Sequence, residues 1–274
     1  QRSISRFSHP DQSLPVTVRY FSCYIGATRK SEHIMDASIQ TIPVINLLIA
    51  FIPVAIVLII MLTWAQKTGQ ALYAIARMVL QLVVIGYLLV FIFETKHSLI
   101  VVAVLTVMLV AAGWISLNVM EESRRQLLLP AVVSLLIGGG VTLLVVTQWV
   151  LALDPWFLPR YMVPLAGMTF ANAMTSLSLA GERYAAEIDK GESKEDARRT
   201  AMTTGMIPVV NALFAVGLVA LPGMMTGQIL SGISPLIAVR YQIMVMCMMF
   251  GGAGLSAACF LWYLGRSQFT RRAA

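Results

Sequence analysis

The feature that most constrains this chain is a series of long apolar runs separated by short polar loops. The hydrocarbon core of a bilayer is about 30 Å thick, and a helix needs roughly 20 apolar residues to cross it. Barrel strands, the other structure that satisfies its backbone in lipid, alternate in polarity over about 10 residues, and these runs do not alternate. We therefore expect an all-α, polytopic helical membrane protein with about seven transmembrane helices. The runs lie at residues 42–64, 72–93, 99–118, 130–152 and 157–180, and at about 204–222 and 236–264.

Composition and charge agree with a membrane protein. Hydrophobic residues make up 58% of the chain and charged residues 12%, whereas an average soluble domain carries roughly 25% charged residues. The formal net charge of +7 comes from basic residues placed between the apolar runs. They form no basic stripe with interleaved aromatics, so we expect the lipid bilayer, and no nucleic acid, as a partner.

Residues 1–34 differ from the rest of the chain. They are polar, irregular and mildly basic, and no apolar run of signal-peptide length follows their basic residues. We expect a disordered leader or an upstream translated segment over residues 1–34, and a transmembrane domain over residues 35–274.

Lys and Arg predict the orientation, because loops on the cytoplasmic side carry an excess of them. From Met35 onward, one set of loops holds eleven basic residues and the opposite set holds three. We expect the N-terminus outside, the C-terminus in the cytoplasm, and a multi-pass location in the cell inner (plasma) membrane. The eleven are Lys67, Arg124, Arg125, Arg183, Lys190, Lys194, Arg198, Arg199, Arg266, Arg271 and Arg272, and the three are Lys96, Arg160 and Arg240.

Few polar side chains fall inside the spans. Arg77 and Gln81 are four residues apart and share one face of the second span. A charged Arg away from the interface costs about 2.5–3.5 kcal/mol on insertion scales, so Arg77 either extends to the headgroups or lines a polar path through the membrane. Asn172 in the fifth span either hydrogen-bonds a neighbouring helix or belongs to the same path. The interiors of the spans contain no carboxylate, which argues against a proton-coupled carrier.

A charged segment at about 181–206 separates the fifth and sixth spans. Ser193, followed by Glu195 and Asp196, has the pattern of a helix start with acids in the first turn. The segment is either a solvated loop or a docking helix for a cytoplasmic partner. The order of features in this segment looks like the coupling loop of ABC-transporter membrane subunits, which has a Gly, then a short polar helix with Ala and Arg, and then a Pro. The residues that match this pattern are Gly191, Glu195, Ala197, Arg198 and Pro208.

One stretch resembles a known family. VGLVALPGMMTGQILSGISPLIAVRYQIMVM, at 216–246, closely resembles the signature of the Fet-type iron-export ABC permeases, which are related to plant aluminium-tolerance membrane subunits. The resemblance extends over about residues 70–264. It implies the membrane subunit of an ABC exporter, iron export from the cytoplasm, and a complex of two permeases with two ATPase subunits.

The resemblance also implies that the chain is not itself an enzyme and binds no cofactor. It has no GxxxxGK[ST] nucleotide-binding loop, so ATP is expected on a separate partner subunit. From the residues alone, two other classes stay open: an ion-coupled secondary transporter and a non-transporting membrane scaffold.

The segment from Pro222 to Gly227 is a candidate gate. Pro222 and Gly223 are expected to end the sixth span near the outer face, and Gly223 and Gly227 have the spacing of a close-packing motif. Met224 and Met225 lie between them. We hypothesise a gate here, with a static packing element as the alternative.

No set of metal ligands stands out in the sequence. Glu94, His97 and Asp154 fall in loops that could meet on the outer face, but these loops need not come together. The metal-binding residues are therefore unknown at this stage.

Overall fold

A computed structural model describes residues 42–64, 68–95, 97–120 and 124–266. The expected leader at 1–34 lies outside the described residues, as do Lys67, Lys96, Arg271 and Arg272. The regular secondary structure of the described part is helical, apart from one isolated bridge between Val216 and Ala220. The all-α expectation is thus confirmed for this part of the chain.

The helices follow one another with short connections. The first group is α2 (Val44–Ile49), α3 (Phe51–Trp64), α4 (Thr68–Glu94) and α5 (Ser98–Ser116). One continuous helical stretch then contains α6 (Arg124–Leu135), the π-helix η2 (Leu136–Gly140), α7 (Val141–Leu144) and the π-helix η3 (Val145–Val150). The last group is α8 (Pro159–Asp189), α9 (Lys194–Ala215), α10 (Gly223–Leu230) and α11 (Pro235–Arg266).

Five helical stretches of the described chain are long and apolar enough to cross a membrane. They are Ile45–Trp64, Gly69–Glu94, Ser98–Ser116, Arg124–Val150 and Pro235–Arg266. They correspond to the first, second, third, fourth and seventh predicted spans, which supports a polytopic membrane protein. The fifth and sixth predicted spans correspond to α8 and α9, which are 31 and 22 residues long but carry more polar and charged side chains.

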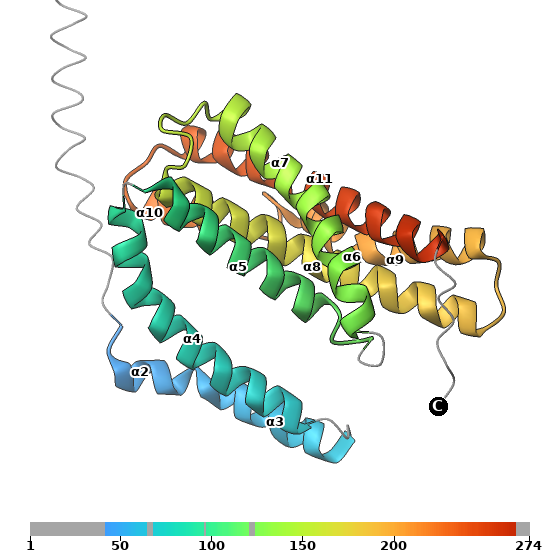
Figure 1. Ribbon diagram of the computed structural model, residues 1–274. Coiled ribbons are helices and arrows are strands. Elements are labelled where there is room, and N and C mark those ends of the chain that lie inside the picture. Colours follow the sequence, from blue (N-terminus) through green and yellow to red (C-terminus); the bar gives the residue numbers. More distant parts are fainter. Residues whose placement is uncertain (1–41, 65–67, 96, 121–123, 267–274) are drawn as a thin grey trace, which may run out of the picture.

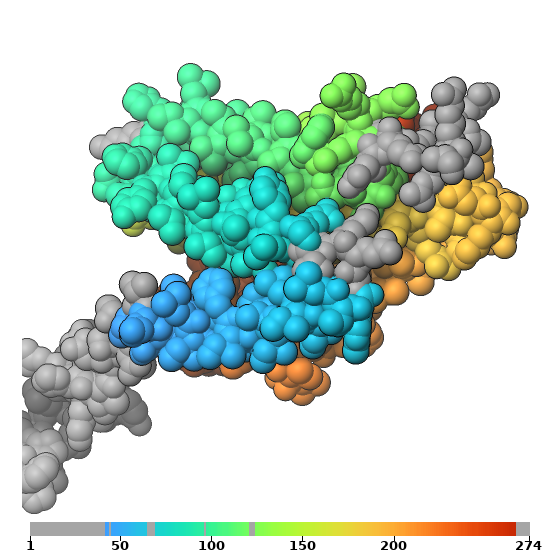
Figure 2. Space-filling model, turned by 90° about the horizontal axis from the view of Figure 1, so that it is seen from below, coloured from blue at the N-terminus to red at the C-terminus, as the bar shows by residue number. Residues whose placement is uncertain are grey.

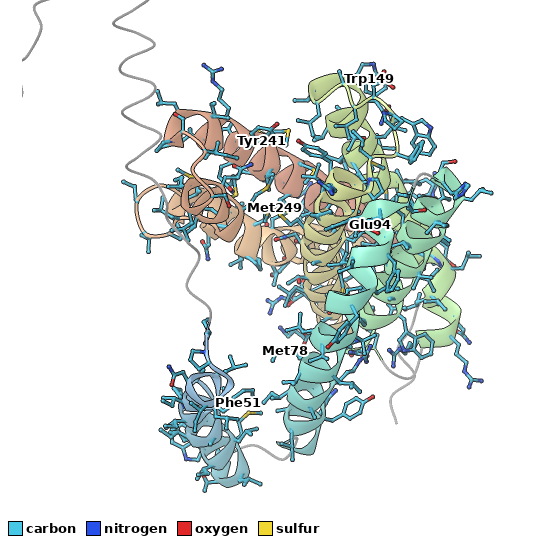
Figure 3. The ribbon with its side chains drawn as sticks, turned by 90° about the vertical axis from the view of Figure 1, so that its left-hand side faces the viewer. Phe51, Met78, Glu94, Trp149, Tyr241 and Met249 are labelled. Atoms are coloured by element: carbon cyan, nitrogen blue, oxygen red, sulfur yellow. The ribbon has the colours of Figure 1, made fainter. Side chains whose placement is uncertain are left out.

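The helices from α5 to α11 form a bundle with α8 at its centre (Figure 1). The long helix α8 packs against α5, α9 and α11, and fifteen of its residues are buried. By contrast, α3 has no buried side chain and lies across the face seen in Figure 2. In Figure 3, Phe51 of α3 and Met78 of α4 lie to one side of the bundle, away from Tyr241 and Met249 of α11.

Small residues let three helices of the bundle approach one another closely. A Cβ on Gly138 of η2 would collide with the backbone nitrogen and hydroxyl of Ser256 on α11, and one on Gly252 would lie 2.8 Å from Thr169 of α8. The glycine Gly139 faces Phe170 and Thr169, so η2, α8 and α11 meet at one crossing. Lipid tails are as apolar as the helices, so such close contacts, rather than exclusion of water, stabilise the bundle.

The sixth span ends earlier than predicted. The expectation that Pro222 and Gly223 end it is wrong, because α9 stops at Ala215. The backbone N–H groups of Val219 and Ala220 both donate to the carbonyl of Ala215, and Gly217 has a φ of +83° that favours glycine. Pro222 instead precedes α10 as its N-cap.

A tight turn at Gly232 leads into the last apolar helix. Gly232 has a φ of +85°, a conformation that glycine adopts without strain. Three residues later Pro235 begins α11, in the first-turn position where its missing N–H costs nothing.

The crossing yields a stability prediction. Gly138→Ala should lower the free energy of unfolding by about 1–3 kcal/mol, because the added methyl meets the backbone of α11 rather than a flexible side chain. Thermal unfolding of the detergent-purified protein checks this. The matched control is Gly86→Ala in α4, where no atom lies within 4 Å of the added group, and equal unfolding temperatures for the two variants would contradict the prediction.

Candidate functional site

The most distinctive polar feature is the charged hairpin, which we define as residues 181–206. It comprises the last turns of α8, a short turn and the first turns of α9. With its 31 residues α8 is about 46 Å long, which exceeds a hydrocarbon core of about 30 Å. In Figure 1 this end of α8 and α9 projects beyond the other helices, and Figure 2 shows it as the yellow lobe at the edge of the molecule.

Most of the predicted charged loop is therefore helix. The segment 181–189 continues α8, and only residues 190–193 form the connection to α9. Gly191 has a φ of +89°, so this position favours glycine. The Oγ of Ser193 accepts a hydrogen bond from the backbone N–H of Asp196 at 3.2 Å, and Glu195 and Asp196 lie in the first turn. The helix start predicted at Ser193 is confirmed, and the acids there interact favourably with the helix dipole.

A buried carboxylate anchors the base of the charged hairpin. Glu187 is 7% exposed and pairs with Arg183 at 2.8 Å and with Lys190 at 3.0 Å. Sequence reasoning missed this residue because it treated 181–206 as one loop. The signal was present, since Arg183 and Lys190 stand four residues before and three residues after Glu187, which is the spacing of neighbours on a helix.

The first turns of α9 have an inner and an outer face. Ala197 and Ala201 are fully buried against the bundle, whereas Glu195, Arg198 and Arg199 are exposed. The guanidinium of Arg199 lies 2.7 Å from the carboxylate of Glu195, an exposed pair that adds little stability. The outer face is thus a charged surface on a helix whose inner face is fixed.

The charged hairpin is also joined to the end of α11. The Nζ of Lys194 donates to the carbonyl of Gly265 at 3.2 Å, in the last turn of α11, where a cation is favourable. A hollow of about 510 Å³ lies between α9 and α11 beside these contacts. It is lined by Arg198, Arg199, Met202, Thr203, Ala258, Leu261 and Trp262.

Two further features place α9 firmly on α8. Tyr184 is 1% exposed, and its burial raises the pKa of the phenol while the positive charge of Arg198 acts in the opposite direction. A Cβ on Gly205 of α9 would lie 2.7 Å from the carbonyl oxygen of Ser176 and 2.8 Å from the Cβ of Ala180 on α8. The predicted coupling residue Pro208 lies inside α9, which continues through it, and its side chain is exposed.

The candidate gate residues lie on α10. Gly223 begins this helix, Met224 packs against the core cluster, and Met225 is half-buried. A Cβ on Gly223 or on Gly227 would meet no atom within 4 Å, so the two glycines make no close helix contact with the described part of this chain. The gate stays a prediction.

The polar residues predicted inside the spans differ in their burial. Arg77 and Gln81 are both exposed on α4, whereas Asn172 on α8 is half-buried. The side-chain amide of Asn172 donates to the carbonyl of Met168 on its own helix, at 2.9 Å. Within the described residues, no three His, Cys, Asp or Glu side chains gather as a metal site, so Glu94, His97 and Asp154 do not converge there.

The fold and the charged hairpin define a class: a polytopic helical membrane protein whose central helix, α8, is longer than a hydrocarbon core is thick. Comparison with known proteins supplies the family. Residues 44–269 match the model of the uncharacterised protein family UPF0014, and the chain belongs to this family.

Curated relatives agree with the resemblance noted from the sequence. The chain is 36% identical over 205 residues to the UPF0014 membrane protein slr1647 of Synechocystis, covering 69% of this chain and 79% of that protein. It is 32% identical to protein ALUMINUM SENSITIVE 3 of Arabidopsis thaliana, over 80% of this chain and 85% of that protein. It is 37% identical to the probable iron export permease protein FetB of Escherichia coli, over 46% of this chain and 54% of that protein. No solved structure matches the chain.

The cap of α9 can be tested directly. Ser193→Ala should cost about 0.5–2 kcal/mol of local stability, because the amide of Asp196 loses its acceptor. Hydrogen exchange should rise in the first turn of α9. The control is Thr203→Ala on the same helix, whose hydroxyl donates only to the carbonyl of Arg199, and equal protection in both variants would count against the cap.

Proposed function

We propose that this chain is the membrane-spanning permease subunit of an ABC exporter, driven by a separate ATPase subunit that binds the charged hairpin. The observation that carries the proposal is the length and anchoring of α8 and α9. The two helices pack closely together at Gly205, and the connected ends of α8 and α9 form a charged surface. A partner pressing on this surface would move helices at the centre of the bundle.

The connection of the hairpin to α11 supports this role. Lys194 bonds the last turn of α11, and α11 packs against η2, α8 and α9. The far end of α11 begins at Pro235, next to the candidate gate on α10. A displacement of the charged hairpin therefore has a path of packed helices to the gate segment.

The proposed topology has seven spans with the charged hairpin in the cytoplasm. The five apolar stretches are joined by α8 and α9, which are long enough to cross despite their charged ends. Of the described basic residues outside span interiors, eight lie at the end of the bundle where α5, α8 and α11 finish, and two lie at the opposite end. The eight are Arg124, Arg125, Arg183, Lys190, Lys194, Arg198, Arg199 and Arg266, and the two are Arg160 and Arg240.

Iron is the proposed cargo. The support is the similarity to a probable iron export permease and the absence of a carboxylate inside the described spans, which disfavours proton coupling. The working unit is proposed to contain two copies of this chain and two ATPase subunits, with ATP bound by the ATPase subunits.

Co-purification tests the partner. We expect a C-terminally tagged chain, gently solubilised from native membranes, to retain an ABC ATPase in stoichiometric amount. Arg199→Glu should reduce this retention about tenfold or more, because it reverses a charge on the outer face while the inner face stays packed. Quantitative mass spectrometry of the purified complex gives the ratio of the two subunits.

Two controls separate docking from folding. The double variant Glu195→Arg with Arg199→Glu keeps the ion pair within α9 but reverses the positions of its two charges. This variant should therefore also fail to retain the ATPase. Arg240→Glu, at the opposite end of the bundle, should retain it. A wild-type protein that exports iron without any ATPase would support a secondary transporter, and normal cellular iron after deletion would support a scaffold.

The gate segment gives a second functional prediction. Gly227→Leu should leave the thermal stability and ATPase binding unchanged, because a Cβ at this position would meet no atom of the described chain within 4 Å. Iron export from loaded vesicles should fall severalfold if this helix moves against another surface during transport. The control is Gly86→Leu on α4, where a Cβ also meets no atom within 4 Å. Full export by the Gly227→Leu variant would contradict the gate hypothesis.

A further inference from the structure

A groove of about 440 Å³ lies between α4 and α5, on the side of the molecule away from α11. Its walls are apolar except for one cation, Arg77, and the hydroxyl of Thr106. It is lined by Arg77, Thr106, Val107, Val110, Ala111, Trp114 and Ile115. The residues from α5 reach its last turn, so the groove opens toward the charged end of the bundle, where α6 begins.

Arg77 has no charge partner among the described residues. It is exposed, stands nine residues after the start of α4, and lies about 14 Å along the helix axis. A guanidinium cannot lose its proton, and leaving it unpaired against hydrocarbon is costly. The groove therefore requires an anion or water at this position.

The described helices offer no carboxylate at this depth. Glu94 and Asp154 lie at the far end of the bundle, and the other described acids all belong to the charged hairpin or its connection. The described part of a second copy, packed against α4, would therefore bring another Arg77 but no acid to neutralise it. Charge complementarity favours an anion from the membrane itself.

We propose that this groove binds an anionic phospholipid, with the lipid phosphate on Arg77 and an acyl chain along the apolar wall of α5. Arginine forms paired hydrogen bonds with phosphate oxygens, and basic pockets between membrane helices bind anionic headgroups. The occupant must be amphipathic, because the site joins one cation to a long apolar wall. The inference is independent of transport, since the lipid binds whether or not the chain exports iron.

The mouth of the groove is already organised for a headgroup. The guanidinium of Arg124 lies 3.8 Å from the centre of the Trp114 ring and donates to the Trp114 carbonyl at 2.8 Å. Trp114 is thus held in place at the end of α5, where tryptophans favour the interface. Arg77 lines the same groove, so a phosphate bound to Arg77 shares the groove with Trp114.

Native mass spectrometry of the full-length protein in mild detergent tests the proposal. After exposure to a mixture of phosphatidylglycerol and phosphatidylcholine, the wild type should retain phosphatidylglycerol preferentially. Arg77→Gln should lower the retained phosphatidylglycerol about tenfold, because the lipid phosphate loses one charged hydrogen-bonded contact. Arg240→Gln, an exposed arginine at the far end of the bundle, should retain it at the wild-type level.

A second variant keeps the test decisive if Arg77→Gln folds poorly. Val110→Trp fills the groove without changing charge, since Val110 is 45% exposed within it, and it should also expel the lipid. Equal retention in wild type, Arg77→Gln and Val110→Trp would overturn the proposal. So would dissociation of a dimer by Arg77→Gln with no change in bound lipid, which would make the groove an interface between copies.

Discussion

The close approach of η2, α8 and α11 at their glycine crossing is the contact on which the rest of the structure depends. Gly138 leaves no room for a side chain against Ser256, and Gly252 leaves little against Thr169. Within a bilayer, helices gain nothing by hiding apolar surface from one another, so packing at contact distance must hold the bundle. The crossing fixes α8 at the centre, and α5 and α9 pack onto α8 in turn.

Because α8 is fixed at the centre of the bundle, the charged hairpin at its end is held in a defined position. The helix is longer than a hydrocarbon core is thick, and in its last turns the buried carboxylate of Glu187 is neutralised by Arg183 and Lys190. The same turns carry α9, which Lys194 joins to α11. Under the proposed function, force applied to the exposed face of α9 would reach the centre of the bundle through packed helices.

The polar residues of the spans divide into two kinds. Asn172 satisfies its amide on its own helix, within the bundle, and adds no charge to the interior. Arg77 stands on α4, outside the bundle, and its charge must be met by a molecule other than the described chain. The membrane part thus keeps charge out of its core and places one cation where lipid can reach it.

The sequence by itself determined the fold class, most span positions and the cap at Ser193, because apolar length and capping chemistry are local properties. It could not place the end of the sixth span, since the turn after Ala215 depends on backbone hydrogen bonds and on Gly217 rather than on Pro222. Nor could it show that residues 181–189 continue α8, or that a Cβ on Gly223 or Gly227 would meet no atom of another described helix within 4 Å. Those facts depend on which helices lie side by side, and only the tertiary structure decides that.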